Sequence, residues 1–258
     1  MKVVLFCGGL GTRLREYSET IPKPLATIGL RPIIWHLMKY YAHHGHKEFI
    51  LCLGYRGDLI KEYFLNYNET VSNDFVLTQG GKNIELLKSD IDDWKITFID
   101  TGLNSNIGER LQAVEPYLED DEYFMANYSD GLSDLDINEV VQDVKNQKAV
   151  ASFVSVKPSQ SFHAVEADAQ GLVDKIQEVS DAEYWINGGF MVLHRHIFDY
   201  MNAGEELIDQ PFHRLIAEKK LYTRKYSGFW AAMDTYKDKR RFDSMYDSGN
   251  TPWMVWEK

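Results

Sequence analysis

The chain has 258 residues, of which 44% are apolar and 13% aromatic, and its formal net charge is −11. Enough apolar side chains are present for a sizeable core, which excludes an intrinsically disordered chain. The acidic balance argues against a nucleic-acid-binding surface, so an anionic ligand would need a local basic pocket. We expect one domain that spans residues 1–258.

Three features of the sequence predict the cellular compartment of the protein: its N-terminal residues, the length of its apolar runs and its cysteines. The N-terminal residues run directly into an apolar strand without a charged leader, and no run of about 18 apolar residues occurs. The only cysteines, Cys7 and Cys52, lie in separate apolar runs and predict buried free thiols rather than a disulfide. These features predict a cytoplasmic protein without a membrane span.

The first thirty residues combine a strand, a glycine-rich turn and two cations. An apolar strand over residues 3–7 is followed by a turn that ends in a threonine and an arginine: Gly8, Gly9, Gly11, Thr12 and Arg13. Lys23 stands between two prolines ten residues later. Backbone N–H groups of such a turn can bind phosphate oxygens, and Arg13 and Lys23 would add two positive charges. The segment therefore predicts a site for a nucleoside triphosphate.

Two better-known glycine motifs fit this segment poorly. A dinucleotide-binding G-x-G-x-x-G would need a third glycine at Leu14, and a P-loop would need a lysine followed by serine or threonine. The structural alternative is a tight turn at a strand end, in which the glycines bind no ligand. Arg13 and Lys23 favour phosphate over that alternative.

Strand-like and helix-like segments alternate through the first half of the chain. The spacing of apolar residues, with Gly45 and Asp136 as helix caps, predicts helices over 32–41, 58–67 and 136–145 and strands over 48–53, 95–99 and 122–126. Residues 68–92 are polar and irregular and predict an excursion from the core. The alternation predicts an α/β fold of the Rossmann-like class, with a mostly parallel mixed sheet flanked by helices.

The second half is richer in strands. The pattern predicts strands over 150–156, 162–167, 171–178, 188–193 and 221–226 and helices over 210–219 and 236–246. A mixed sheet or a β-rich half that binds a second substrate would produce this pattern.

Two aspartates are candidate metal ligands. Asp130 follows the strand predicted at 122–126, and α/β proteins bind ligands in the crevice outside the carboxyl ends of their strands. Mg²⁺ prefers carboxylates together with phosphate and water. The alternatives are an Asp-Gly turn at Asp130 and a helix N-cap at Asp234. Only a partnership between the two residues favours metal binding.

Three other groups allow structural interpretations. His43, His44 and His46 crowd a predicted helix end, where the helix dipole favours cations, and a metal site there is the less favoured alternative. Asn187 and Gly188 would either approach a polar ligand or form a bulge at a strand start. The closing aromatics Trp253 and Trp256 predict cover for the core or a subunit contact.

Taken together, these motifs resemble those of the sugar nucleotidyltransferases over nearly the whole chain, and most closely the branch that uses CTP and glucose 1-phosphate. The matching segments are GGLGTRL at 8–14, PKP at 22–24, PIIWHLMKYY at 32–41, GYRG at 54–57, IKEYF at 60–64, DTG at 100–102, GERL at 108–111, YSDG at 128–131, INGGF at 186–190 and GFWAAMDT at 228–235. The resemblance implies an enzyme in which a phosphate oxygen of the acceptor attacks the α-phosphorus of the triphosphate and pyrophosphate leaves.

The resemblance also implies roles for individual residues. Nucleotide-binding residues would be Leu5, Cys7, Gly8, Gly9, Gly11, Thr12, Arg13, Lys23, Ser105, Gly108, Arg110 and Ser129. Catalysis would rest on Arg13, Lys23 and Asp130, and Mg²⁺ would be held by Asp130 and Asp234. Acceptor-binding residues would be Tyr128, His163, Glu178, Asn187 and Gly188. A nucleotide-binding part would cover about 1–135 and an acceptor-binding part about 136–258. We also expect a homo-oligomer, with the 68–92 excursion and the aromatic tail as candidate subunit contacts.

Several positions depart from the family pattern. The family has Glu-Lys-Pro where this chain has Glu178, Val179 and Ser180, and that lysine is the expected cation for the acceptor's phosphate. His163 replaces a glycine and is a candidate substitute cation. Leu103, Ser129 and Leu30-Arg31 also differ. CMP transfer to a non-sugar phosphate or phosphonate, and a nucleotide-binding regulatory module without turnover, are therefore the alternative functions.

Overall fold

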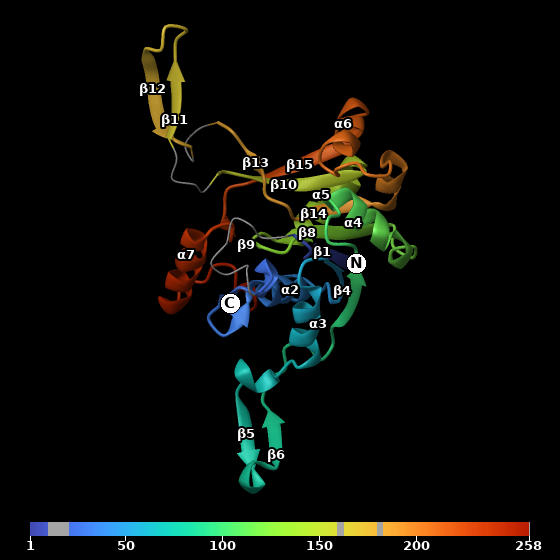
Figure 1. Cartoon of the computed structure of the whole chain (residues 1–258), viewed down its shortest axis with the longest axis vertical. Coiled ribbons are helices and arrows are strands. Elements are labelled where there is room, and N and C mark those ends of the chain that lie inside the picture. Colours follow the sequence, from blue (N-terminus) through green and yellow to red (C-terminus); the bar gives the residue numbers. More distant parts are fainter. Residues whose placement is uncertain (10–20, 159–162, 180–182, 258) are drawn as a thin grey trace.

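An eight-stranded mixed sheet forms the centre of the molecule (Figure 1). The computed structural model describes residues 1–9, 21–158, 163–179 and 183–257. The strands of the sheet are β1 (Lys2–Phe6), β4 (Glu48–Leu53), β7 (Lys95–Asp100), β8 (Tyr123–Tyr128), β10 (Ala151–Val156), β13 (Ile186–Asn187), β14 (Met191–His194) and β15 (Leu221–Tyr226). Their order is β13-β10-β14-β8-β1-β4-β7, and β15 pairs with β10.

Parallel pairing dominates this sheet. β1 is parallel to β4 and β8, β4 is parallel to β7, and β10 is parallel to β15. Both β13 and β14 run antiparallel to β10, and β14 is also antiparallel to β8. The carboxyl ends of β1, β4, β8, β10 and β15 therefore lie at one edge, where an α/β sheet forms its ligand crevice.

Helices cover both faces of the sheet. They are α2 (Ile33–His43), α3 (Gly57–Leu65), α4 (Ile107–Val114), α5 (Ile137–Gln147), α6 (Gln210–Ala217) and α7 (Tyr236–Asp247). Alternate residues of β1 enter two separate cores, because successive strand side chains point to opposite faces. Val3 and Leu5 pack with α2, α3, α5 and α7, whereas Val4 and Phe6 pack with α4 and α6. This arrangement confirms the α/β prediction.

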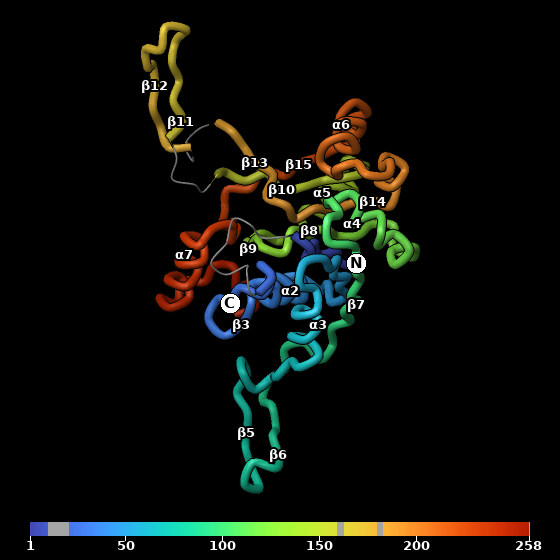
Figure 2. The backbone as a smooth tube through the Cα atoms, in the orientation of Figure 1, coloured from blue at the N-terminus to red at the C-terminus, as the bar shows by residue number. Residues whose placement is uncertain are grey.

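Four two-stranded antiparallel sheets complete the described structure: β2–β3 (Thr27–Ile28, Arg31–Pro32), β5–β6 (Phe75–Thr78, Asn83–Leu86), β9–β16 (Gly131–Ser133, Trp230–Ala232) and β11–β12 (His163–Ala167, Val173–Glu178). Short 3-10 helices lie at Lys23–Leu25, Glu69–Val71, Gln79–Gly81, Glu115–Tyr117, Arg195–Tyr200 and Val255–Glu257. The backbone trace shows β5–β6 and β11–β12 as two arms that project from opposite ends of the molecule (Figure 2). The predicted excursion at 68–92 thus contains the first arm.

The structure differs from the predicted local structure in two places. The α4 helix was not predicted, although Asn106 and Glu109 form a reciprocal capping box at its start. The strand predicted over 188–193 starts only at Met191 in β14, because Gly189 and Phe190 have φ values of 77° and 50°. The buried Asn127 side chain stabilises this break by accepting a hydrogen bond of 2.9 Å from the Phe190 N–H.

The C-terminal tail packs on the first half of the chain. Trp253 is fully buried, and its ring contacts those of Phe229 and Phe242 at centroid distances of 5.7 and 5.3 Å. Its indole Nε1 donates a hydrogen bond of 3.4 Å to Nδ1 of His36 in α2. The predicted core-covering role of the tail is therefore confirmed. In the part of the chain that the structure describes, no helix has the length and apolarity needed to cross a membrane.

Candidate active site

A cavity of about 500 Å³ lies at the carboxyl ends of β1 and β8. The residues that line it come from the ends of these two strands, the segment before and within α4, the 3-10 helix at 23–25, the loop before α6 and the segment just before α7. Its described lining consists of Phe6, Cys7, Gly8, Gly9, Lys23, Pro24, Leu103, Asn104, Ser105, Asn106, Ile107, Arg110, Tyr128, Ser129, Asp130, Glu206 and Asp234. Because parallel strands end together here, residues distant in sequence converge on one volume.

Lys23 joins the two aspartates. Its Nζ donates a hydrogen bond of 2.8 Å to Oδ1 of Asp234 and a second, shorter one to Oδ2 of Asp130. The N-cap of α7 is Thr235, whose hydroxyl accepts from the N–H of Asp238. The Asp234 carboxylate is therefore directed at Lys23 rather than capping the helix. The partnership on which the metal hypothesis depended is present in the geometry.

The two carboxylates also determine the charge state of the lysine. Burial lowers the pKa of Lys23, but Coulombic attraction and hydrogen bonds from Asp130 and Asp234 outweigh this effect, so the pKa is raised above its usual value. The side chain is consequently an ammonium at neutral pH. Two carboxylates around one ammonium leave this cluster with a formal charge of −1.

The donor set is suited to a hard divalent cation. Asp130 and Asp234 reach a common point, now occupied by the Lys23 ammonium, and Mg²⁺ usually takes one or two carboxylates and completes its shell with phosphate and water. Among the described residues no group of three or more His, Cys, Asp and Glu side chains could hold a metal alone. The histidines at the end of α2 form no such group: His44 pairs with Asp136, and His46 is hydrogen-bonded to Asn138.

Arg110 braces the loop that follows β1. It is 2% exposed, and its guanidinium donates hydrogen bonds to the carbonyl of Gly8 at 3.1 Å, the carbonyl of Leu53 at 3.1 Å and the hydroxyl of Thr101 at 2.7 Å. A Cβ at Gly8 would lie 2.1 Å from Nη1 of Arg110. Gly8 is therefore required by close packing against this cation, whereas a Cβ at Gly9 would meet no described atom within 4 Å.

Other predicted nucleotide-binding residues line the cavity or support its wall. Cys7 is buried, and burial raises the pKa of its thiol to about 12, so it is an unreactive neutral group. Ser129 donates a hydrogen bond of 2.8 Å to the carbonyl of Phe6. Leu5 is fully buried in the core, and Gly108 packs where an added Cβ would lie 2.1 Å from the carbonyl oxygen of Glu205. Cys7 and Cys52 are both buried and free, as predicted.

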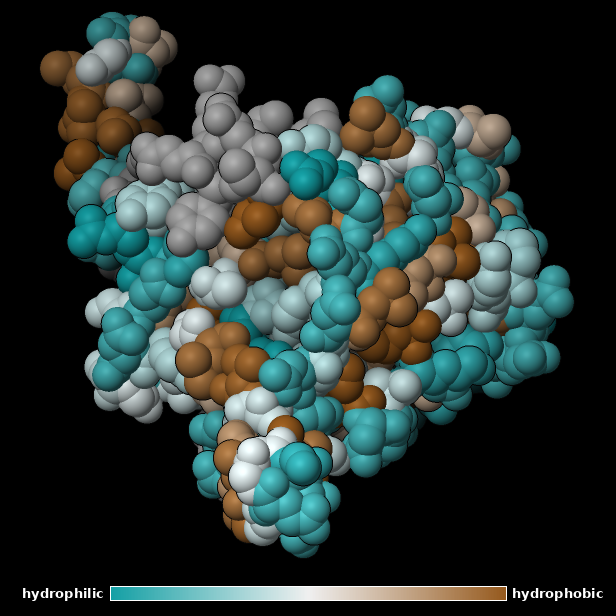
Figure 3. Space-filling view, turned by 60° about the horizontal axis from the view of Figure 1, so that its bottom comes forward, coloured by the Kyte–Doolittle hydropathy of each residue, from teal (hydrophilic) through white to brown (hydrophobic). Residues whose placement is uncertain are grey.

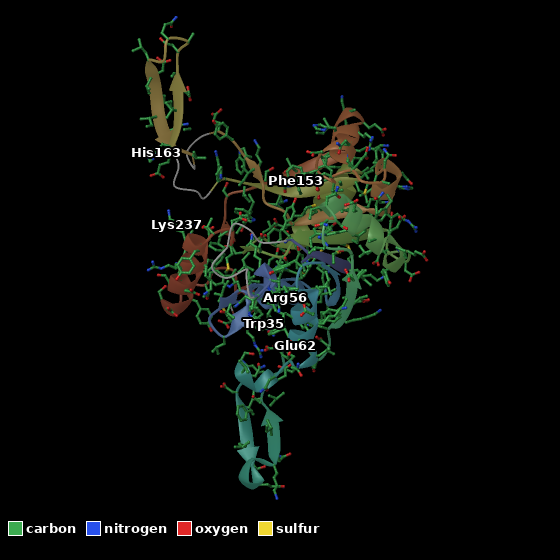
Figure 4. All side chains as sticks on the ribbon, viewed as in Figure 1. Trp35, Arg56, Glu62, Phe153, His163 and Lys237 are labelled. Atoms are coloured by element: carbon green, nitrogen blue, oxygen red, sulfur yellow. The ribbon has the colours of Figure 1, made fainter. Side chains whose placement is uncertain are left out.

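The predicted acceptor-binding residues are divided between two places. Tyr128 lines the cavity, where burial raises the pKa of its phenol to about 12 and the nearby Asn187 side chain opposes this effect only in part. The neighbouring Gly188 accepts a hydrogen bond of 2.8 Å from Nε1 of Trp230. In contrast, His163 and Glu178 are register partners in the β11–β12 arm, and His163 lies at the base of that arm, away from the central sheet (Figure 4). The structure does not bring these two to the cavity.

Some site residues were not predicted, and others cannot be compared. Asn104 and Glu206 line the cavity without having been predicted, whereas Asn106 lies in the 105–110 stretch that the resemblance assigns to base recognition. Nothing local in the sequence distinguishes Glu206 from other acidic loop residues. The predicted residues Gly11, Thr12 and Arg13 lie outside the described residues.

A comparison with protein families identifies the family of this chain. A model of the family described as nucleotidyl transferase matches residues 2–235. The chain belongs to this nucleotidyl transferase family. It is therefore an enzyme that transfers a nucleotide, as the resemblance implied.

Curated members of the nucleotidyl transferase family are similar over the full chain. The glucose-1-phosphate cytidylyltransferase of Salmonella typhi is 38% identical over 259 residues, with 100% of both chains covered. A probable glucose-1-phosphate cytidylyltransferase of Bacillus subtilis is 36% identical over 258 residues, covering 99% of this chain and all of the relative.

Solved structures of nucleotidyl transferases share the fold. A UDP-glucose pyrophosphorylase complexed with UDP-glucose has a TM-score of 0.70 at 16% identity, covering 96% of this chain and 98% of that one. A putative glucose-1-phosphate thymidylyltransferase from Bacillus anthracis has a TM-score of 0.67 at 17% identity, covering 95% and 94%. These similarities confirm the predicted fold class.

Proposed function

We propose that this nucleotidyl transferase moves CMP from CTP to glucose 1-phosphate and releases pyrophosphate. The observation that carries the proposal is the Lys23 ammonium held between Asp130 and Asp234 in a cavity at the carboxyl ends of parallel strands. The cytidine and glucose 1-phosphate specificities are supported by the full-length relatives at 36–38% identity.

In this reaction an oxygen of the acceptor's phosphate forms a bond to the α-phosphorus of CTP. The bond between that phosphorus and the oxygen bridging to the β-phosphate breaks, and its electron pair leaves with pyrophosphate. Negative charge spreads over the nonbridging oxygens in the transition state, so a fixed cation contributes most of the stabilisation. Lys23 would be that cation, and the two aspartates keep it protonated and in the cavity before the substrates bind.

A divalent cation, which we propose to be Mg²⁺, fits the two carboxylates. Asp130 and Asp234 would hold it when the triphosphate is present. When bound, the ion supplies Lewis-acid polarisation of the phosphate oxygens and a template for their geometry. Lys23 would then exchange its carboxylate partners for phosphate oxygens, which requires only a shift of its flexible side chain.

The segment from Ser105 to Arg110 is the proposed base-recognition wall. Ser105 donates to the carbonyl of Thr101 at 2.5 Å, and Arg110 is fixed by backbone carbonyls. Both residues are therefore held rigidly at the cavity wall before a ligand arrives. Such pre-organisation lowers the ordering cost of binding.

A panel of nucleotides and acceptors tests the proposal. Pyrophosphate release is measured with CTP, UTP or dTTP in combination with glucose 1-phosphate or with a non-sugar phosphate or phosphonate. We expect the highest kcat/KM for CTP with glucose 1-phosphate. Efficient turnover of only the non-sugar acceptors would replace the sugar substrate by the alternative that Val179 favours.

We also propose that the two arms are contacts between copies of the chain. On β5–β6, Leu77 and Ile84 are register partners that are 57% and 51% exposed; on β11–β12, Val165 and Ile176 are partners that are 56% and 64% exposed. Hydrophobic residues are visible on both arms in Figure 3. Isolated hairpins are marginally stable in water, so an apolar ladder on each arm favours association.

The first arm is anchored firmly enough to serve in such a contact. At the base of this arm, Asp90 accepts hydrogen bonds from Lys39 at 2.9 Å, Tyr67 at 2.9 Å and Ser72 at 2.6 Å. Sedimentation equilibrium tests the proposal: Leu77→Lys together with Ile84→Lys is expected to reduce the oligomer to smaller species. The matched Val76→Lys control lies on the opposite face of β5, paired with Glu85, and is expected to retain the wild-type mass.

A further inference from the structure

Glu206 is a carboxylate on the cavity wall to which the proposed transfer gives no role. Among the described lining residues the carboxylates are Asp130, Asp234 and Glu206, and the first two are bound to Lys23. Glu206 lies in the loop before α6, and its Oε2 accepts a hydrogen bond of 3.3 Å from the N–H of Ile107, the first residue of α4. This contact holds the carboxylate against the 105–110 segment, which is the proposed base-recognition wall.

The start of α4 has its own cap without Glu206. Asn106 and Glu109 form a complete capping box there. The other oxygen of Glu206, Oε1, accepts a hydrogen bond of 3.1 Å from the N–H of Leu207. Each oxygen of an ionised carboxylate has two lone pairs, so each can accept one further hydrogen bond from a ligand in the cavity.

The loop fixes Glu206 from both sides. The preceding residue, Glu205, accepts hydrogen bonds of 2.6 and 2.5 Å from Nη1 and Nη2 of Arg214, and the following residue, Leu207, is fully buried. A Cβ added at Gly108 would lie 2.1 Å from the carbonyl oxygen of Glu205, so the loop and the first turn of α4 are in close contact. The carboxylate is therefore held in position before a ligand binds, which lowers the ordering cost of binding.

The negative charge of Glu206 acts inside the cavity. Burial is the main cause that raises the pKa of Tyr128 to about 12, and the charge of Glu206 adds to this effect. A carboxylate on this wall attracts hydrogen-bond donors and repels acceptors and anions. The triphosphate is anionic, so the part of a nucleotide that Glu206 can contact favourably is a neutral group that donates a hydrogen bond.

The two pyrimidine bases differ in such a group. Cytosine has an amino group at position 4, which donates hydrogen bonds, whereas uracil has a carbonyl oxygen there, which only accepts them. Because a carboxylate also only accepts, a uracil carbonyl beside it would leave two acceptors without a hydrogen between them. Discrimination of this kind uses the penalty against the wrong ligand as well as the bond to the right one.

We propose that Glu206 selects CTP over UTP by accepting a hydrogen bond from the 4-amino group of cytosine. This inference rests on the proposed transfer of CMP from CTP, and it assigns the preference for cytosine to one side chain. In this role Glu206 contacts the base and takes no part in the chemistry at the α-phosphorus.

Glu206→Gln tests the assignment, because glutamine keeps the shape of glutamate, removes its charge and can donate to a uracil carbonyl. We expect kcat/KM to fall for CTP and to rise for UTP, so that the ratio of the two falls at least about 10-fold. A loss of this size is typical of a hydrogen bond to a charged group. Both values come from one preparation of the variant, so a partly unfolded preparation does not change the ratio.

A CTP analogue that lacks the 4-amino group, 2-pyrimidinone ribonucleoside triphosphate, isolates the contact. The wild-type enzyme should use this analogue about 10-fold less efficiently than CTP, whereas Glu206→Ala, which has no acceptor, should use both within about twofold. If Glu206 instead bound a ribose hydroxyl, its loss would lower kcat/KM for CTP, UTP and the analogue by the same factor. That result would overturn the assignment.

Glu48→Gln is the matched control for the loss of one carboxylate. Glu48 is exposed at the amino end of β4, at the opposite end of the parallel strands from the cavity, where it pairs with Lys95 at 3.2 Å. The ratio of kcat/KM for CTP and UTP should stay at its wild-type value in this variant.

The outcomes separate the base contact from the proposed function. If the wild-type enzyme prefers CTP and Glu206→Gln keeps the wild-type ratio, the contact is overturned and the function stands. A wild-type preference for UTP overturns the contact and the cytidine specificity, while nucleotide transfer to glucose 1-phosphate stands.

If no acceptor supports pyrophosphate release, the function fails, and calorimetric titration of CTP and UTP decides the contact. A wild-type preference for CTP that Glu206→Gln loses supports the contact. Equal affinities of the wild-type protein for the two nucleotides, no binding of either, or a preference that the variant keeps overturns it.

Discussion

In the cavity, Lys23, Asp130 and Asp234 come from three distant segments and meet at one ammonium group. In the β11–β12 arm, His163 and Glu178 are paired by register, yet the arm holds them away from the cavity. The first group is positioned by the 3-10 helix at Lys23–Leu25, by the end of β8 in the central sheet and by the segment between β16 and α7. The second depends on a hairpin with no neighbour in the described chain.

This contrast shows which motif residues the fold brings together at the cavity. Strand ends in a parallel sheet share an edge whatever their separation in sequence, so motif residues that follow them converge. A two-stranded arm has no such constraint, because its hydrogen bonds are satisfied within itself.

The largest expected effect comes from breaking the carboxylate–ammonium cluster. Lys23→Ala and Asp130→Asn should each lower kcat by about 10²–10³-fold, because a fixed group that stabilises transition-state charge is lost. Steady-state pyrophosphate release measures this, with circular dichroism to show a retained fold and Lys95→Met as the control. Near wild-type rates in either variant would remove that residue from the catalytic machinery.

A second prediction concerns the contact between the C-terminal tail and the first half. His36 is buried, and burial lowers its pKa to about 4, while its Nε2 donates to the carbonyl of Ile28 at 3.0 Å. In the unfolded chain His36 binds a proton below about pH 6.5, whereas in the folded chain it does so only below about pH 4. Its contribution to the free energy of unfolding is therefore fully present above pH 6.5 and is lost as the pH falls. The loss should approach about 3 kcal/mol.

Chemical denaturation between pH 7 and 4.5 measures that loss. His36→Gln should flatten the dependence of the free energy of unfolding on pH, although it also lowers stability at pH 7. His43→Gln, in the same helix but outside the Trp253 contact, should leave the slope as in the wild type. An unchanged slope in His36→Gln would show that His36 does not couple the tail to protonation.

The glycines of the first loop offer a sharper comparison within the cavity. Gly8→Ala would place a methyl group against the guanidinium of Arg110 and should cost about 1–3 kcal/mol, a cost typical of overpacking. The methyl group of Gly9→Ala would lie within 4 Å of no described atom, and this variant should leave the thermal midpoint unchanged. Differential scanning calorimetry measures both, and equal midpoints would mean that Arg110 adjusts without cost.

By itself the sequence determined the helices and strands that have a regular apolar spacing, together with the residues of the carboxylate–ammonium cluster. Apolar periodicity located β4 and β15 to the residue, and it located α2 and α7 within two residues, because burial on one face leaves a spacing that is visible in the chain. The motifs also identified Lys23, Asp130 and Asp234. Their residue types, and for Asp130 its position after a strand, indicate the chemistry that they can perform.

Tertiary structure alone decided which alternatives were realised. Thr235 rather than Asp234 caps α7, Arg110 braces Gly8 from within the wall, and β13 separates from β14 at a left-handed Phe190. Such contacts depend on sheet order and register, which are set by long-range pairing and leave no periodic trace in any one segment.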